Sequence, residues 1–357
     1  MVTATIGFDA RRLKDSGIGV YTQYLISAVL AHKPAHVRVV IVLQNTPPDG
    51  WIRPDTLIVQ CPYRAYDPRE HLFFRRLSDK HLIELFHACH PWRPLGSLSC
   101  QWTCTLHDLI PFAIPDAISN PILRLYFMMM TRYAVMRSDA TIAVSQWTRE
   151  QAIKKWPQIV PKISVVHNGV DHVKTSTLPA EPEPFILFVG QWKAYKGLPL
   201  LIQALEQLIQ NPKFAHFRLK ILGKPKAPIT DQIAQSSARD AIECLGWVSL
   251  EDVQTLYSTC ACTVLASRME GFGFPYIETL LAGSKLVAYQ TPITTELGIP
   301  DAYLFNQYTP DALCRKMEMV IESPSATTPD FAQLTWDNSA NNTLATLEKI
   351  APDVLSF

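Results

Sequence analysis

Glu270-Gly-Phe-Gly-Phe-Pro-Tyr-Ile-Glu278 is the stretch of this 357-residue chain that decides its fold. The apolar, β-branched run Ala261–Ala266 before it is typical of a buried strand, and Tyr276–Ala282 has the apolar spacing of a helix. Pro275 suits the first position of that helix, because no N–H donor is needed there, and the two glycines let a ligand approach the backbone. The stretch therefore predicts a strand, a ligand-binding loop and a helix.

The loop suits a ligand that carries both an anion and neutral hydroxyl groups. A helix N-terminus carries roughly half a positive charge, which favours a nucleotide diphosphate. The carboxylates of Glu270 and Glu278 repel phosphate, but they accept hydrogen bonds from hydroxyl groups such as those of a hexose and a ribose. A sugar nucleotide meets both requirements.

Further short motifs run along the chain in a fixed order. They are Gly17-Ile-Gly19-Val-Tyr21, Leu106-His107-Asp108-Leu-Ile-Pro111, Val144-Ser145, His167-Asn168-Gly169-Val-Asp171, Phe188-Val-Gly190 with Lys196-Gly197, and Leu245-Gly246-Trp-Val-Ser249. Together with the two glutamates that flank seven residues, this series resembles the retaining GT-B glycosyltransferases of family 4, bacterial mannosyltransferases in particular, over nearly the whole chain. The resemblance implies an α/β protein of GT-B fold, in which two Rossmann-like domains face a deep interdomain cleft.

Length and composition agree with two ordinary globular domains. The chain exceeds what one hydrophobic core usually supports, and 48% of its residues are hydrophobic and 18% charged. Residues 1–180 carry a net charge of +7 and residues 181–357 one of −6. The basic half suits an anionic acceptor or peripheral contact with an acidic membrane surface, or it is an ordinary solvated surface with a few phosphate-binding groups. No nucleic-acid partner is expected.

The cysteines and the N-terminus point to a reducing compartment. The eight cysteines show no zinc-like spacing, and several lie in apolar strands, as reduced core thiols do. The N-terminus lacks the charged region of a signal peptide, and no apolar run reaches transmembrane length. We expect a cytoplasmic protein, with peripheral contact at the inner face of the membrane left open.

Short apolar strands alternate with helical stretches, which predicts parallel sheets wrapped by helices. A polar, proline-rich run, Lys174–Pro184, has the composition of a linker. We therefore predict one domain over residues 1–174, a linker over 175–184 and a second domain over 185–335. The resemblance implies that the first is the acceptor-side domain and that the second binds the nucleotide sugar. The resemblance adds that residues 336–357 form a helix crossing back to the first domain. A capping box is predicted at Ser249–Asp252.

Residues 69–86 are basic and rich in bulky apolar side chains. Two interpretations stay open: a surface helix that contacts a membrane or a lipid-linked acceptor, and a packed amphipathic helix.

The resemblance also implies a set of functional residues. His107 follows the strand Cys104–Leu106, at the edge where ligands of parallel sheets bind, and the family uses the matching histidine against the donor sugar. Glu270 would bind the donor sugar, Glu278 the ribose and Lys196 the diphosphate. His107, Glu270 and Lys196 are the catalytic candidates. The donor-binding candidates are Gly17, Gly19, Gly190, Lys193, Lys196, Gly271, Phe272, Gly273, Phe274 and Glu278.

The chain departs from the family and from the dinucleotide-binding pattern at particular positions. Arginines that accompany the family's lysine are replaced by Gln191 and Tyr195, which leaves Lys193 as the candidate substitute. Thr22 stands where a dinucleotide fingerprint needs its third glycine, so the Gly17–Gly19 segment is either a loop over the donor diphosphate or only a tight turn. No Asp-x-Asp triplet occurs, so a divalent metal is not expected. No cofactor is expected either, because the nucleoside diphosphate sugar is a substrate.

The resemblance thus implies a retaining hexosyltransferase, and the absence of an Asp-x-Asp triplet predicts that it is metal-independent. Its first-choice donor is GDP-mannose, and its acceptor is a saccharide or lipid-linked saccharide in polysaccharide or lipopolysaccharide assembly. Same-face attack is favoured over a covalent carboxylate intermediate. The donor's sugar and base stay open, and so do two alternatives: a sugar-nucleotide epimerase of GT-B fold and a non-catalytic sugar-nucleotide binder.

Overall fold

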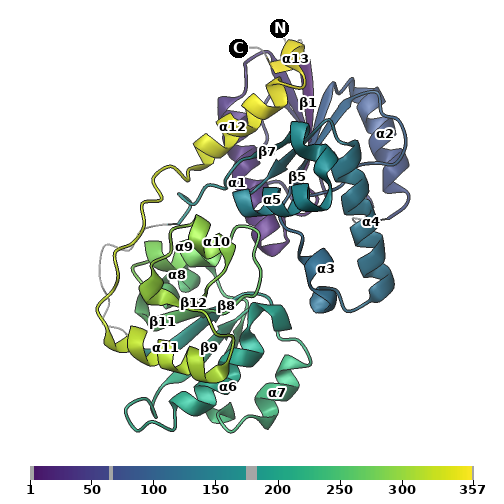
Figure 1. Ribbon diagram of the computed structural model, residues 1–357. Helices are drawn as coiled ribbons and strands as arrows, with labels where there is room; N and C mark the ends of the chain where they lie inside the picture. Colours follow the sequence, from purple (N-terminus) through teal and green to yellow (C-terminus); the bar gives the residue numbers. More distant parts are fainter. Residues whose placement is uncertain (1–3, 64–66, 174–182, 356–357) are drawn as a thin grey trace. The chain divides into compact units, whose positions relative to one another are not determined.

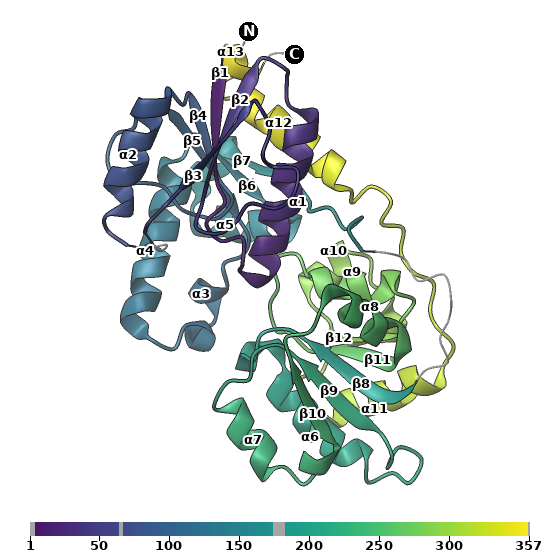
Figure 2. The ribbon, with the colours of Figure 1, turned by 180° about the vertical axis from the view of Figure 1, so that it is seen from behind.

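The computed structural model describes residues 4–63, 67–173 and 183–355, which form two units (Figure 1, Figure 2). The first unit consists of Met1–Phe112, Asn120–His172 and Ala332–Phe357, and the second of Ala113–Ser119 and Val173–Phe331. The linker predicted at residues 175–184 lies outside the described residues, except for its last two.

The first unit is built on a parallel sheet. In its described residues the strands are β1 Ala4–Asp9, β2 Val37–Leu43, β3 Thr56–Gln60, β4 Leu85–Ala88, β5 Gln101–Leu106, β6 Ala140–Ala143 and β7 Ile163–Val165. Their order is β3-β2-β1-β4-β5-β6-β7, and every neighbouring pair is parallel. The order reverses between β1 and β4, so these two strands flank the switch point of the sheet.

Helices cover both faces of this sheet. They are α1 Ser16–His32, α2 Glu70–His81, α3 Ile110–Ala113, α4 Pro121–Arg137, α5 Gln146–Lys155, α12 Trp336–Glu348 and α13 Pro352–Leu355. The first unit also contains the 3₁₀ turn η2 Pro157–Lys162, whereas the 3₁₀ turn η1 Pro115–Ala117 belongs to the second unit. The start of α4 is well defined. The Asn120 side chain accepts hydrogen bonds from the amides of Ile122 and Leu123, and Pro121 has no N–H group that would need an acceptor.

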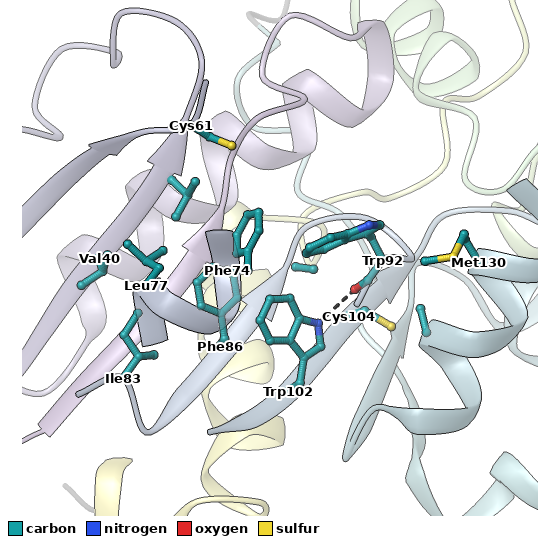
Figure 3. Packing of buried hydrophobic residues seen from close by; sticks show 13 residues of the cluster. Val40, Cys61, Phe74, Leu77, Ile83, Phe86, Trp92, Trp102, Cys104 and Met130 are labelled. Atoms are coloured by element: carbon teal, nitrogen blue, oxygen red, sulfur yellow. Dashed lines mark hydrogen bonds between the residues drawn. The ribbon is translucent and has the colours of Figure 1, made fainter. Parts of the chain in front are cut away.

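An aromatic core joins α2 and α4 to β4 and β5 (Figure 3). The rings of Phe86 and Trp102 stack with centroids 4.3 Å apart, and Trp102 Nε1 donates to the Trp92 carbonyl at 3.0 Å. Phe74 of α2 packs edge-on against both stacked rings. These contacts fix α2 in the body of the first unit.

The basic stretch at residues 69–86 is therefore a packed helix over only part of its length. Phe74 and Leu77 of α2 are buried, as the packed amphipathic interpretation predicts. The helix ends at His81, where Leu82 takes a left-handed conformation, and Leu85 begins the buried strand β4. The prediction of one continuous helix was wrong, because apolar residues of a strand continue the apolar pattern of the helix.

The C-terminal segment belongs to the first unit and is attached through the His167–Asp171 motif. The Trp336 amide donates to Asp171 Oδ1 at 2.8 Å, and the Val170 amide donates to the Leu334 carbonyl at 2.7 Å. A Cβ atom on Gly169 would lie 2.3 Å from the Trp336 nitrogen, so only glycine lets the two segments meet. The motif thus has a structural role in seating α12.

The second unit has a parallel sheet of the same kind. Its described strands are β8 Glu183–Val189, β9 Arg218–Leu222, β10 Ile242–Gly246, β11 Cys260–Leu265, β12 Leu286–Tyr289 and β13 Leu304–Phe305. The order is β10-β9-β8-β11-β12-β13, which reverses between β8 and β11. Its helices are α6 Leu198–Leu208, α7 Ile229–Gln235, α8 Leu250–Thr259, α9 Phe274–Leu281, α10 Pro292–Glu296 and α11 Pro310–Glu322, with 3₁₀ turns η3 Ala194–Lys196, η4 Arg239–Ala241 and η5 Asp301–Tyr303.

Two local predictions for this unit have clear outcomes. The capping box is confirmed, because Ser249 and Asp252 exchange hydrogen bonds at the start of α8. Pro275 is the second residue of α9 and not the first, since the helix begins at Phe274 after Gly273, whose φ is +84°.

The predicted alternation of strands and helices in two parallel-sheet α/β domains is confirmed. In the described part of the chain, every helix is too short or too polar to span a membrane.

Candidate active site

The loops that follow β8 and β11 touch each other at the switch point of the second sheet. A Cβ atom on Gly197 would lie 2.4 Å from the Ala266 carbonyl oxygen, and the left-handed φ of +83° at Gly197 also requires glycine. The Arg268 amide donates to the Tyr195 carbonyl at 2.9 Å. In open α/β sheets, ligands bind beyond the carboxyl ends of the strands at such a switch point. The two loops therefore form the candidate site.

Lys196 and Glu270 meet in this site as an ion pair. Lys196 Nζ donates to both carboxylate oxygens of Glu270, at 2.7 and 2.8 Å. Both side chains keep some exposure, 20% for Lys196 and 14% for Glu270. The Tyr195 ring lies beside the ammonium groups of both Lys193 and Lys196, with centroid distances of 5.8 and 5.5 Å. The site thus holds two cationic groups and one carboxylate that a ligand can reach.

The glycine-rich loop before α9 is closely packed. Phe272 and Phe274 are buried with their ring centroids 5.2 Å apart, so their side chains support the loop from inside. At Gly273 a Cβ atom would lie 2.4 Å from the Tyr276 ring. Gly271 is buried as well. Four residues of this loop were predicted to bind the donor. Of these, Phe272 and Phe274 can contact a ligand through their backbone atoms, because their rings are buried.

Glu278 lies on α9, on the turn after Phe274, and is held by a residue that the motif does not include. The Tyr257 hydroxyl of α8 donates to Glu278 Oε2 at 3.0 Å. Burial raises the pKa of the Glu278 carboxyl to about 7, and the Tyr257 hydrogen bond opposes this rise. Glu278 Oε1 is the second acceptor that this carboxyl offers to a hydroxyl group.

Gly190 connects the site to the loops after β9 and β10. A Cβ atom on Gly223 would lie 2.1 Å from the Gly190 carbonyl oxygen, and the Gly223 amide donates to the Gly246 carbonyl at 2.9 Å. Trp247, next in the chain, is strongly exposed, and Lys224 is exposed in the neighbouring loop. The sequence-based predictions gave neither side chain a role, and the structure places them in the loops after the strands β9 and β10.

The predicted residues Gly17 and Gly19 lie in the first unit, but not in a loop. They are in the first turn of α1, which begins at Ser16. A Cβ atom on Gly19 would lie 2.3 Å from the Leu13 carbonyl oxygen, so glycine is needed there for close packing of the helix start against the preceding turn. The expected loop at this position was wrong, and the structure gives Gly19 a packing role.

His107 follows β5, as predicted, and its ring is fixed from two sides. Nε2 lies 2.8 Å from the Cys89 carbonyl, and the ring packs edge-on against Tyr21 at 4.8 Å. A carbonyl only accepts, so Nε2 carries a proton and, in the neutral ring, Nδ1 is an acceptor. Burial lowers the pKa of His107 to about 4. The neutral imidazole thus presents an acceptor, which suits a sugar hydroxyl.

A buried charge cluster marks the switch point of the first sheet and was not foreseen from the sequence. Arg11 forms two hydrogen bonds to Asp9, at 2.9 and 2.8 Å, and also pairs with Glu70 of α2. Burial raises the pKa of Asp9, but the charges of Arg11 and His90 outweigh this and hold it below its usual value. All four side chains are buried, and the Arg11–Glu70 pair links the loop after β1 to α2. The described residues contain no group of three histidine, cysteine or acidic side chains arranged to hold a metal ion.

The family models match the two halves of the chain separately. Residues 16–174 match Glycosyltransferase Family 4, and residues 171–333 match Glycosyl transferases group 1. The two matches overlap over residues 171–174 and together include every predicted site residue.

Curated relatives include several mannosyltransferases at low identity. The O-antigen chain mannosyltransferase RfbU of Salmonella typhimurium is 26% identical over 203 residues, which cover 55% of this chain and 54% of that protein. The serotype-specific mannosyltransferase WbdA of Escherichia coli is 24% identical over 298 residues, covering 75% of this chain and 36% of that protein. The matches span about half the length of these relatives, or less.

Solved structures of similar fold cover nearly the whole chain. WaaG, a glycosyltransferase involved in lipopolysaccharide biosynthesis, superposes with a TM-score of 0.70 at 15% identity, covering 98% of this chain and 99% of that one. Sucrose-phosphate synthase from Thermosynechococcus elongatus gives a TM-score of 0.69 at 19% identity, with 98% and 97% covered. At these identities the likeness shows the fold, which is the predicted GT-B arrangement of two α/β domains.

Proposed function

This chain belongs to the GT-B glycosyltransferases, and from that premise we propose that it moves a hexose from a nucleoside diphosphate sugar to a saccharide or lipid-linked saccharide acceptor. The proposed setting is polysaccharide or lipopolysaccharide assembly, with retention of configuration at the transferred sugar. GDP-mannose is the proposed donor, and the names of the mannosyltransferase relatives support mannose as the transferred sugar.

The single observation that carries the proposal is the Lys196–Glu270 pair at the switch point of the second sheet. A sugar nucleotide has a diphosphate for the ammonium group and sugar hydroxyls for the carboxylate. In the absence of ligand the two side chains neutralise each other. With donor bound, Lys196 would turn to the diphosphate and Glu270 would accept hydrogen bonds from the sugar.

The proposed chemistry is leaving-group stabilisation by Lys196. As the bond between the sugar and the diphosphate breaks, negative charge grows on the phosphate oxygens, and a fixed ammonium group stabilises that charge. The departing phosphate would take the acceptor's proton on the same face of the sugar. Lys193, beside the same Tyr195 ring, is proposed to add the second positive charge that an arginine supplies in the family. No metal or cofactor is included in this proposal.

The remaining roles are those expected from the family. Glu278 would bind the ribose through Oε1, because Tyr257 already occupies Oε2. His107, neutral and with Nδ1 as an acceptor, would receive a hydrogen bond from a hydroxyl of the donor sugar. These two roles stay predictions.

The experiment measures nucleoside diphosphate release from each common sugar nucleotide, with and without oligosaccharide acceptors and in the presence of a chelator. We expect release from one donor, preserved in the chelator and reduced about a hundredfold or more in Glu270→Gln or Lys196→Met. Glu251→Gln, an exposed carboxylate on α8, is the matched control and should leave turnover unchanged.

Two outcomes would contradict the proposal. Nucleotide binding without release from any donor, across the acceptors tested, would favour a non-catalytic binder. A change in the sugar nucleotide itself without any acceptor, seen by product analysis, would favour an epimerase.

A further inference from the structure

The motif at the start of α1 lies beside His107 and not in a loop. Gly17-Ile-Gly19-Val-Tyr21 continues into Thr22, and the side chains of Tyr21 and Thr22 are buried in the first unit. Tyr21 contacts the His107 ring directly, and Thr22 reaches it through Cys89. Two neighbouring residues of one helix thus converge on this histidine.

Tyr21 contacts His107 with its ring and is itself held by a chain of buried hydrogen bonds. The two ring centroids are 4.8 Å apart, and the ring planes are nearly perpendicular at 85°. The Tyr21 hydroxyl lies 2.7 Å from Thr105 Oγ1, which in turn lies 3.0 Å from His87 Nε2. Beyond the His87 ring, Nδ1 lies 2.9 Å from Thr103 Oγ1. All these side chains except His107 are at most 1% exposed, so they depend on one another for hydrogen bonds.

The direction of each bond in this chain follows from its last member. Thr103 Oγ1 donates to the Phe86 carbonyl at 3.3 Å, so the same oxygen accepts from His87 Nδ1. Burial lowers the pKa of His87 to about 3, so the ring is neutral and its Nε2 is an acceptor. Thr105 therefore donates to His87 Nε2 and accepts from the Tyr21 hydroxyl. The Tyr21 hydroxyl is thus fixed in a single orientation.

Thr22 holds the residue whose carbonyl fixes His107. The Thr22 hydroxyl donates to the Ile18 carbonyl at 2.7 Å, one turn earlier in α1, so its oxygen accepts from the Cys89 thiol. The Cys89 carbonyl in turn accepts from His107 Nε2 at 2.8 Å. Cys89, which is buried, therefore connects α1 to the imidazole through its thiol and its carbonyl.

We propose that Tyr21 and Thr22 are positioning residues that keep His107 in the one ring orientation in which Nδ1 serves as the acceptor. A half-turn of the ring would bring Cε1 to the Cys89 carbonyl and Cδ2 to the place of Nδ1, so both hydrogen bonds would be lost. The other tautomer would place an unprotonated Nε2 against a carbonyl that only accepts. The inference rests on the proposed function, in which His107 receives a hydrogen bond from the donor sugar.

The first test follows the His107 ring by nuclear magnetic resonance in the full chain, with histidine labelled by a nitrogen isotope. Protonated and unprotonated ring nitrogens differ in chemical shift, and His107→Asn identifies this ring among the ten histidines. At about pH 7 the wild type should show a protonated Nε2 and an unprotonated Nδ1. Tyr21→Phe and Thr22→Val should each move the two shifts toward each other, because the ring then samples a second tautomer.

Turnover gives an independent test. Tyr21→Phe and Thr22→Val should each lower kcat/KM for the donor about tenfold, because a catalytic group that leaves its productive orientation contributes less. If the two residues act through His107, neither substitution should lower kcat/KM further when it is combined with His107→Ala. A residue that only supports the fold would lower it in both backgrounds.

Matched controls lie in the same unit. Tyr133→Phe removes a hydroxyl that accepts from the Gly96 amide at 3.1 Å, and Thr343→Val removes a buried hydroxyl of α12. Both variants should keep the wild-type His107 signals and kcat/KM. Thr22→Ser keeps the hydroxyl and should also keep the signals, which separates the lost hydrogen bond from lost packing. Circular dichroism should show that every variant is folded.

Two results would overturn the proposal. One is a set of His107 signals that stays unchanged in both Tyr21→Phe and Thr22→Val, and the other is a loss of kcat/KM that persists in the His107→Ala background. Changed signals in the variants, with no turnover of any sugar nucleotide by the wild type, would support the positioning of His107 and count against the transferase. The two proposals therefore fail separately.

Discussion

Burial raises the pKa of the Glu278 carboxyl from 4.5 to about 7. The folded chain therefore binds this proton more tightly than the unfolded chain, and the carboxylate lowers stability as the pH rises through that interval. Glu278→Gln removes the charge and keeps the shape. We expect it to raise the free energy of unfolding by about 1–3 kcal/mol at about pH 8 and to change it little at about pH 4, where both states are protonated.

Urea unfolding at the two pH values measures this effect, with Glu251→Gln, an exposed carboxylate, as the control. A gain of equal size at both pH values would show that the charge of Glu278 is not its cause. The variant should also bind donor less well, since the amide offers one acceptor where the carboxylate offers two.

Tyr257 sets the pH at which Glu278 ionises. Its hydroxyl donates to Glu278 Oε2 at 3.0 Å, which lowers the pKa of the carboxyl against the rise due to burial. Donor KM should therefore fall as the pH rises through about 7, and Tyr257→Phe should shift that fall to higher pH. A series of donor KM measurements at different pH values tests this. Tyr303→Phe is the control, because the Tyr303 hydroxyl accepts a hydrogen bond from the Ala326 amide and is not the donor to Glu278. A uniform rise in KM without a shift would indicate only a packing defect.

Single residues were predictable where a local motif carried them. Lys196 and Glu270 were both selected from short strings, and the structure brings them within hydrogen-bonding distance although they are 74 residues apart. Tyr257 carries no such signal: it lies in an ordinary helix, and its role comes from packing against α9, 21 residues along the chain. Contacts of that kind depend on the tertiary fold, which spacing alone does not specify.

Among the elements, strands were predicted better than helix ends. The apolar run Ala261–Ala266 matches β11 to within one residue at each end, and the predicted strand Cys104–Leu106 lies within β5. The start of α1 was missed because Asp15, at the cap position, uses its carboxylate on Arg12 and does not cap the helix. The end of α2 was missed because Leu82 takes the left-handed conformation that usually marks a glycine.

The seat of α12 gives a prediction at this scale. Gly169→Ala would place a Cβ atom 2.3 Å from the Trp336 nitrogen and 2.6 Å from the Thr335 carbonyl carbon, so the backbone of the returning segment must shift. We expect a loss of about 3 kcal/mol or more in the free energy of unfolding, as for other overpacked sites. Gly283→Ala is the control, because it meets no atom within 4 Å and should show only the left-handed backbone cost of about 1 kcal/mol. Similar losses in both variants, measured by urea unfolding, would contradict this account of Gly169.

The molecule as a whole repeats one plan, and its sequence shows that plan directly. In both sheets the first strand is central and the order reverses beside it, between β1 and β4 and between β8 and β11. Alternating strands and helices predicted this architecture, because parallel strands are usually joined by helical crossovers. The connections β2–β3 and β4–β5 are exceptions, since the described residues between these strands form no helix. The two switch points differ in chemistry. The first is filled by the buried Asp9–Arg11 cluster, whereas the second keeps the Lys196–Glu270 pair partly exposed.

That difference predicts how ligand should act on the unfolding of the whole chain. Each unit has its own sheet and core, so calorimetry should resolve two transitions, as separate domains often show. A nucleoside diphosphate that binds beside Lys196 stabilises only the second unit, by about 2.7 kcal/mol at a concentration of about 100 times Kd. GDP should therefore raise one transition and leave the other in place. Lys196→Met should abolish the rise in the transition temperature. Lys213→Met removes an exposed ammonium group paired with Glu322 and should preserve the rise. A rise of both transitions together, or a rise that survives Lys196→Met, would show that the nucleotide does not bind where this sheet reverses its order.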